Sequence, residues 1–306
     1  MKKITLLFSA FLLMAFTFTG ETLSEKNYKI YSVKDKKEIK LDDIVSNMKN
    51  YDVIFFGEEH NDSVGHYLEI ELLKKMHATY GSNLALSMEM FETDCQLVLD
   101  EYLQGFIREK NFKKEGRAWS NYKDYRPMIE FAKEKKMEVV AGNAPARYVN
   151  MAGRMGESSL LKLSPEAKKY LPPLPYDTAT GKYFYKLGGI GPESPKPDSA
   201  TLAMQAMMQM PPFGIHSQSL WDASMAYSIA TCFKKDKTKK IMQVNGRFHS
   251  DEYYGIVAQL RKYNPEIRIL VISCLSDDQF PKTDFSQYTG NGDYIIATDP
   301  KVPKTF

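Results

Sequence analysis

The chain has 306 residues, of which 43% are hydrophobic and 26% are charged, as in ordinary globular proteins rather than disordered or fibrous ones. Its net charge of only +3 argues against nucleic-acid binding. The three cysteines, Cys95, Cys232 and Cys274, lie far apart and form no CxxC pair. This excludes a zinc ribbon, an iron–sulfur site and a disulfide-rich scaffold, and it leaves room for one disulfide at most.

The first 20 residues have the pattern of a secretory signal peptide. Lys2 and Lys3 precede an apolar run over residues 4–16, and small and polar residues follow. The run of about 13 residues is shorter than the ~20 needed to span a bilayer, so we expect residues 1–20 to be cleaved rather than kept as an anchor. No cysteine lies near the cleavage site, which argues against a lipoprotein. The mature chain, residues 21–306, is expected in the periplasm or cell envelope, with no transmembrane span.

From residue 21 onward, apolar runs alternate with amphipathic stretches, which predicts an α/β fold with a mostly parallel, helix-covered sheet. After a short hairpin near Tyr28–Lys40, the expected strands are Asp52–Gly57, Leu84–Met90, Met137–Ala141, Lys240–Asn245, Arg268–Ser273 and Asp293–Thr298. The expected helices are Ser63–Tyr80, Asp94–Gln104, Tyr125–Lys136, Ser217–Cys232 and Asp251–Tyr263, with a polar loop before Asp124.

A proline-rich stretch interrupts this alternation between the third and fourth main strands. It predicts an inserted, mainly helical cap at about residues 144–217, with a methionine-rich helix at Ser199–Met210. Residues 21–306 are therefore expected to form a single domain that carries this cap.

Titratable side chains follow the predicted strands at the edge where ligands bind in parallel sheets. Gly57-Glu58-Glu59-His60 and Gly246-Arg247-Phe248-His249 repeat a Gly-x-x-His pattern, and glycine lets the chain turn sharply off a strand. Glu89 follows the second main strand.

Two histidines and a carboxylate are a usual open ligand set for a divalent metal such as Zn²⁺, Mn²⁺ or Co²⁺. His60, His249 and Glu89 are the candidate ligands. Glu58 is either a further ligand or a base that acts on metal-bound water, and Glu89 is the other candidate base. The alternative is that these groups only bind loop amides.

Supporting roles are predicted for four further residues near this rim: His66, Asn143, Asp222 and Arg247. His66 lies at the start of a predicted helix. It could cap this helix, face the substrate or bind the metal, and the sequence favours none of the three. Asp222 either partners a histidine or caps its own helix.

The cap contains Tyr176, Tyr183 and Tyr185 close to two lysines. A tyrosinate can ligate ferric haem, and lysines can pair with its propionates. On residue types alone, packing of these aromatic rings on the core is the simpler interpretation.

Together these motifs resemble those of the ChaN-type haem-binding uptake proteins of the Tiki and erythromycin-esterase-like superfamily. The resemblance rests on Gly57-Glu-Glu-His60 with His66, on Glu89, on Gly142-Asn143-Ala-Pro145 with Arg147, on Trp221-Asp222 before Met225-Ala226, and on Gly246-Arg-Phe-His249. These motifs span about residues 51–273.

The resemblance implies an α/β core with a helical cap that binds haem, often cofacially in a dimer and through tyrosine. On this basis Tyr183, Tyr185 and Arg147 are the candidate haem-binding residues, and a homodimer and an envelope haem receptor are the implied partners. For Tiki-type members it implies metal-dependent proteolysis, with His60, His249 and Glu89 at the matching positions. The predicted function is an exported haem-binding protein of haem or iron uptake, with a metal-dependent peptidase or esterase as the alternative.

Overall fold

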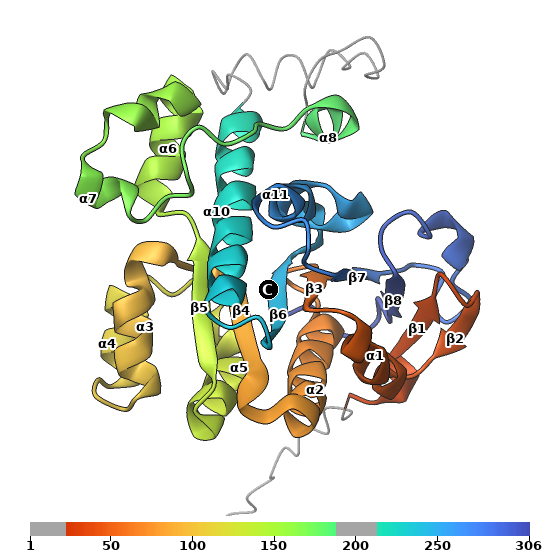
Figure 1. The fold of residues 1–306 in the computed structure, drawn as a ribbon. Coiled ribbons are helices and arrows are strands. Elements are labelled where there is room, and N and C mark those ends of the chain that lie inside the picture. The colour runs from red at the N-terminus through yellow and green to blue at the C-terminus, as the bar shows by residue number, and fades with distance from the viewer. Residues whose placement is uncertain (1–22, 188–212) are drawn as a thin grey trace, which may run out of the picture.

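The computed structural model describes residues 23–187 and 213–306. They form an eight-stranded sheet in the order β2-β1-β8-β7-β3-β6-β4-β5, in which β3 to β8 pair in parallel and β1 pairs antiparallel with β2 and β8 (Figure 1). The strands are β1 (Tyr28–Ser32), β2 (Lys37–Ile39), β3 (Val53–Glu58), β4 (Leu84–Glu92), β5 (Glu138–Asn143), β6 (Lys240–Gly246), β7 (Ile269–Ser276) and β8 (Tyr294–Thr298).

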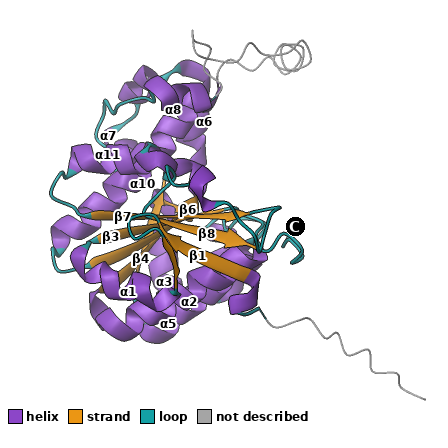
Figure 2. Ribbon diagram, turned by 90° about the vertical axis from the view of Figure 1, so that its right-hand side faces the viewer, coloured by secondary structure: helices purple, strands orange, loops and turns teal. Residues whose placement is uncertain are grey.

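Helices cover both faces of the sheet (Figure 2). The helices α1, α2, α3 and α5 lie on one face, and α10 and α11 lie on the other. The bounds are α1 (Leu41–Asn47), α2 (Ser63–Tyr80), α3 (Gln96–Leu103), α4 (Glu109–Glu115), α5 (Tyr122–Lys135), α6 (Ala146–Met155), α7 (Pro165–Lys168), α8 (Gly181–Lys186), α10 (Phe213–Lys235) and α11 (Gly255–Tyr263).

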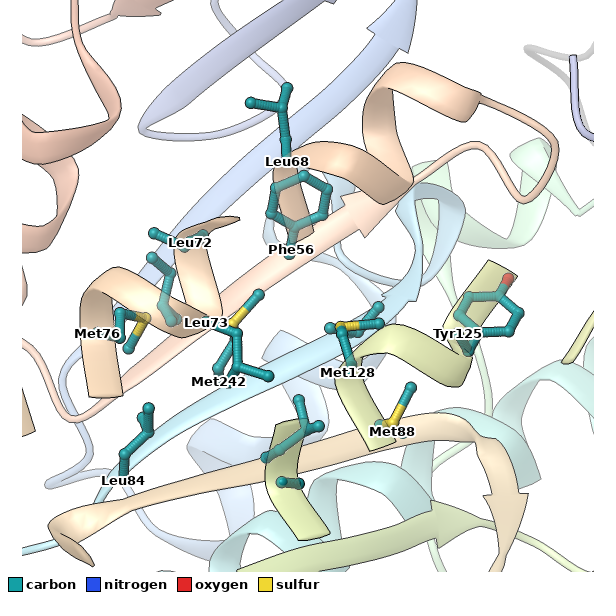
Figure 3. Close-up of a cluster of buried hydrophobic side chains, with 14 of the residues drawn as sticks. Phe56, Leu68, Leu72, Leu73, Met76, Leu84, Met88, Tyr125, Met128 and Met242 are labelled. Carbon is teal, nitrogen blue, oxygen red and sulfur yellow. The ribbon is translucent and has the colours of Figure 1, made fainter. Parts of the chain in front are cut away.

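The two cores follow from side-chain alternation along β3, which is buried throughout. Ile54 and Phe56 point to the α2 face, where Leu68 and Leu72 meet them (Figure 3). Val53 and Phe55 point to the opposite face, against α10 and α11. Both faces of the strand are therefore covered by helices, and all six of its residues are buried.

The strands and helices confirm the predicted α/β class, and the main differences lie in the segments before α5. The predicted polar loop up to Asp124 contains α4, and α5 begins at Tyr122 rather than Tyr125. Phe112 is the physical reason, because this fully buried ring stacks on Tyr102 at 4.6 Å and holds α4 against the core. A single apolar residue in a charged stretch gives no visible periodicity.

The segment predicted as a cap contains α6, α7 and α8 and a 3₁₀ segment, Glu157–Lys162. Apolar residues of α6, of the 3₁₀ segment and of the loop after α7 pack against Leu220 and Ala223 of α10, which is longer than predicted and starts within the segment. Tyr183 and Tyr185, expected in a loop, lie on the short helix α8.

Two predictions, the signal peptide and the Ser199–Met210 helix, fall on residues outside those described. The three cysteines are buried and free. Within the described ranges, no helix is both long and apolar enough to cross a membrane.

Candidate functional site

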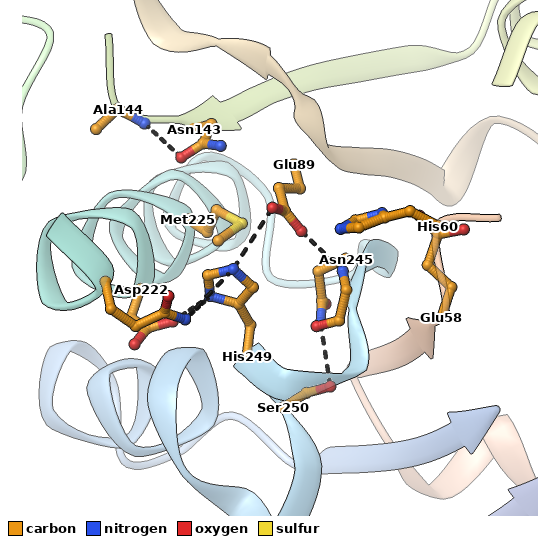
Figure 4. Close-up of polar contacts among 12 residues, drawn as sticks. Glu58, His60, Glu89, Asn143, Ala144, Asp222, Met225, Asn245, His249 and Ser250 are labelled. Carbon is orange, nitrogen blue, oxygen red and sulfur yellow. Dashed lines mark hydrogen bonds and ion pairs between the residues drawn. The ribbon is translucent and has the colours of Figure 1, made fainter. Parts of the chain in front are cut away.

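The parallel register brings the ends of three neighbouring strands together. β6 lies between β3 and β4, and Glu58 of β3 pairs with Gly246 of β6. His60 and His249 follow these two strands, while Glu89 lies near the end of β4. Figure 4 shows the two imidazole rings pointing toward the Glu89 carboxylate from two sides.

His249 is buried between two carboxylates. Its Nδ1 lies 2.6 Å from Asp222 Oδ1 of α10, and its Nε2 lies 3.5 Å from Glu89 Oε1. Burial by itself would lower the pKa of His249, but Glu89 and Asp222 outweigh burial and raise the pKa to about 10. The imidazole therefore holds a second proton at neutral pH.

Glu89 remains ionised although it is fully buried. Burial favours its neutral form, but His249, His60 and the backbone amide of Gly246 together lower the pKa of this carboxyl. The Gly246 amide donates to Glu89 Oε2 at 2.7 Å. This contact ties β4 to the end of β6.

His60 reaches the rim across a glycine. A Cβ at position 246 would lie 2.8 Å from His60 Nε2, so only glycine lets the ring approach this closely. Glu58 Oε1 lies 2.8 Å from His60 Nδ1 and accepts a hydrogen bond from the Tyr125 hydroxyl at 2.7 Å. With Nδ1 held in this way, Nε2 is the nitrogen turned toward Glu89.

One part of the geometry suits the predicted metal ligand His249. The Asp222 contact to Nδ1 leaves His249 Nε2 as the ligand atom, as carboxylate–histidine pairs do behind metals. A metal here would displace one proton from His249 and supply Lewis acidity or activate water. The assignment remains a prediction, because the described ligand atoms that converge within 4.8 Å belong to Glu58, His66 and Glu69 instead.

The predicted haem residues lie outside this cluster or are engaged in it. Tyr183 is buried, and its hydroxyl donates to Asp222 Oδ2 at 2.7 Å. Burial raises the pKa of Tyr183 well above its ordinary value, which opposes a tyrosinate. Tyr185, two residues on, is partly exposed. Arg147 forms an ion pair with Asp94 near the surface.

The supporting residues have mixed positions. His66 lies behind His60, with its Nε2 3.1 Å from the His60 carbonyl oxygen. Asn143 accepts a hydrogen bond from the Ala144 amide. Arg247 binds Asp251 at 2.6 Å and points toward Glu59 rather than toward Glu89.

Sequence analysis gave no sign of three residues in or behind the cluster: Tyr125 contacts His60, Gln218 contacts His249, and Glu69 contacts His66 behind His60. In the sequence, Tyr125 and Glu69 fit the pattern of amphipathic helices, and Gln218 lies among other polar residues. Their contacts arise only when α2, α5 and α10 pack on the sheet. No motif in the sequence marks them.

A parallel sheet between helical layers, with histidines and carboxylates at its carboxyl edge, defines the class as an α/β protein with a polar cluster at the strand ends, where ligands bind in such sheets. Residues 44–260 match the model of the family described as haem-binding uptake, Tiki superfamily, ChaN, and the chain belongs to this family.

Two solved structures are similar to this chain, and the first of them shares its fold. ChaN of Campylobacter jejuni, described with cofacial heme binding, is 14% identical, with a TM-score of 0.64 over 90% of this chain and 98% of that one. An erythromycin esterase, EreC, is 9% identical, with a TM-score of 0.48 over 90% of this chain and 99% of that one. No curated protein matched the chain.

Proposed function

We propose that this protein is exported, binds haem and takes part in haem or iron uptake. The observation that carries the proposal is its membership of the haem-binding uptake family over residues 44–260. The signal-peptide pattern of residues 1–20 supports export, because a positive start, a short apolar core and small residues are what export machinery recognises.

Tyr185 is the better of the two cap tyrosines as an axial ligand. The hydroxyl of Tyr183 is buried and already bonded to Asp222, whereas Tyr185 is partly exposed on the same helix. Lys186 follows directly and offers a cation for a haem propionate. Its present partner is Glu252, which lies at the surface, so the lysine can exchange partners at low cost.

A cavity of about 920 Å³ beside the edge strand β5 is the competing location. It is lined by Tyr170 and Tyr227 and by a group of cations: Lys133, Lys136, Lys169 and Lys235. Its size and its mixed apolar and cationic lining also suit an amphipathic dicarboxylate such as haem.

A hemin titration followed by absorbance tests the proposal. We expect a saturable Soret shift, and we expect Tyr185→Phe to weaken binding roughly tenfold or more because the axial ligand is lost. Tyr183→Phe and Tyr227→Phe are the matched controls. A larger loss of haem affinity in Tyr227→Phe would instead place the haem in the cavity beside β5. The absence of any Soret shift would refute haem binding.

The Asp222–His249–Glu89 chain of contacts supports a second candidate function, metal-dependent hydrolysis at the rim. Here His60, Glu89 and His249 would hold the metal, and Glu58 or Glu89 would take a proton. We expect ester or peptide hydrolysis to require added Mn²⁺, Zn²⁺ or Co²⁺ and to fall at least 100-fold, on the order of a lost general base, in Glu89→Gln. Hydrolysis that survives this substitution would exclude the rim as its source.

A further inference from the structure

A second cluster of ligand-type atoms lies behind the rim, on the opposite side of His60 from Glu89. Glu58 ends β3, and His66 and Glu69 lie in the first two turns of α2. All three side chains are buried, and each offers an oxygen or nitrogen within 4.8 Å of the others. We propose that Glu58, His66 and Glu69 bind one first-row divalent cation, with Mn²⁺ and Zn²⁺ as the leading candidates.

Two unsatisfied oxygens give the first evidence. Glu58 Oε2 and Glu69 Oε1 are buried and have no hydrogen-bond partner among the described groups. Glu58 Oε2 nevertheless lies 3.1 Å from His66 Nδ1, too far off line for a hydrogen bond. A buried carboxylate oxygen without a donor is costly, so a missing positive centre is the natural explanation.

The orientation of His66 gives independent evidence. Its Nε2 lies 3.1 Å from the carbonyl oxygen of His60, which can only accept, so Nε2 carries a hydrogen. In the neutral ring, Nδ1 then presents its lone pair to both carboxylates, at 3.1 Å from Glu58 Oε2 and from Glu69 Oε2. A backbone carbonyl that orients a histidine in this way is a common feature behind metal-binding imidazoles.

The negative charge of the two buried carboxylates also favours a bound cation. Among the described residues, the ion pairs of Glu58 and Glu69 are with histidines and not with lysine or arginine. A divalent ion would neutralise both carboxylates, where a single shared proton would neutralise one.

The separations suit a first-row ion. Ligands that lie about 2.0–2.2 Å from a metal are separated from each other by roughly 3.0–3.5 Å in tetrahedral or octahedral geometry. The two 3.1 Å contacts at His66 Nδ1 fall in this range. Two carboxylates and one imidazole suit Mn²⁺ or Zn²⁺ better than Ca²⁺, which prefers oxygen alone.

Such an ion would position His60. Glu58 would bind the ion through Oε2 while its Oε1 holds His60 Nδ1, and His66 would hold the His60 backbone. The inner cation would therefore fix the ring that faces Glu89 through Glu58, without itself touching His60, Glu89 or His249. Its role does not depend on haem binding.

Metal analysis of the full-length protein, refolded with MnCl₂ or ZnSO₄ and dialysed, tests the proposal. We expect about one tightly held metal per chain and a rise in Tm of about 5 °C over protein refolded with chelator, as expected for a ligand of the native state alone. In Glu69→Gln the affinity for the metal should fall at least tenfold. Glu71→Gln on the same helix, a matched control at a half-buried glutamate paired with Lys74, should keep it.

Glu89→Gln separates the inner site from the rim, because its amide oxygen can still accept from the Gly246 amide. Metal retained in Glu89→Gln and lost in Glu69→Gln supports the inner site, whereas the reverse overturns it. If Glu69→Gln does not fold, X-ray absorption on the wild-type protein decides, because the inner site supplies one imidazole and the rim two. Failure to load any metal overturns the proposal and points to a proton shared by the two carboxyls.

Discussion

Replacing His249 by phenylalanine is expected to lower the free energy of unfolding by about 3–5 kcal/mol at pH 7. The imidazole lies between the buried carboxylates of Glu89 and Asp222, at 3.5 and 2.6 Å. Phenylalanine keeps the approximate shape and removes the positive charge, so two buried carboxylates face each other without a counter-charge. Urea denaturation of both proteins measures the loss.

The pH dependence of this loss follows from the pKa of His249, about 10 in the folded chain against the ordinary value of 6.5. The stabilisation from the bound proton is complete below about pH 6.5 and disappears as the pH rises through 10. The difference in the free energy of unfolding between wild type and His249→Phe should therefore become smaller toward pH 10. A difference that stays constant from pH 6.5 to 10 would show that packing, not charge, determines the loss of stability.

His77→Phe is the matched control for this substitution. His77 is partly buried on α2, contacts the ring of Phe131 and has no ion pair among the described residues. We expect His77→Phe to change the free energy of unfolding by about 0.5 kcal/mol or less. Adding Glu89→Gln to His249→Phe should recover part of the lost stability, because it removes one of the uncompensated charges.

Gly255→Ala is expected to destabilise the protein by about 2–5 kcal/mol and to open the His249 cluster. Gly255 has a φ of +49°, and a Cβ there would lie 2.3 Å from the His249 carbonyl oxygen. The same Cβ would lie 2.9 Å from both Asp222 Oδ1 and the Tyr183 hydroxyl. Denaturation measures the loss, and the NMR titration of His249 should show its pKa falling toward 6.5.

Gly181→Ala distinguishes backbone strain from crowding. Gly181 also begins a helix, with a φ of +58°, but no atom lies within 4 Å of its added Cβ. We expect a cost of about 1–2 kcal/mol from the backbone alone. Equal losses in the two variants would contradict the proposed crowding at His249.

The strand-end part of the site was accessible from the sequence for a simple reason. An apolar run followed by glycine and titratable residues identifies both the strand and the end at which its polar groups emerge, and parallel pairing makes those ends meet. Glu58, Glu89 and the two Gly-x-x-His histidines were located in this way. The order of the strands, with β6 between β3 and β4, was not accessible, because every central strand is similarly apolar.

The inner cluster illustrates what local pattern cannot show. Glu69 lies on the face of α2 that meets the sheet, among Val64, Leu68 and Leu72, yet a lone glutamate in a helix usually faces solvent. It comes within reach of Glu58 only because α2 packs directly over the end of β3. Tyr125 reaches the same carboxylate from α5, 67 residues away in sequence.

The sequence by itself determined the α/β class, the strands whose ends carry the chemistry, and the family resemblance, because these depend on residue types at short spacings. Only the tertiary structure decided which charges meet. It placed Asp222 behind His249, buried the hydroxyl of Tyr183 against Asp222, and set Glu58 between His60 and His66. These contacts join residues from separate helices and strands, and their strength comes from burial, which exists only once the layers have packed.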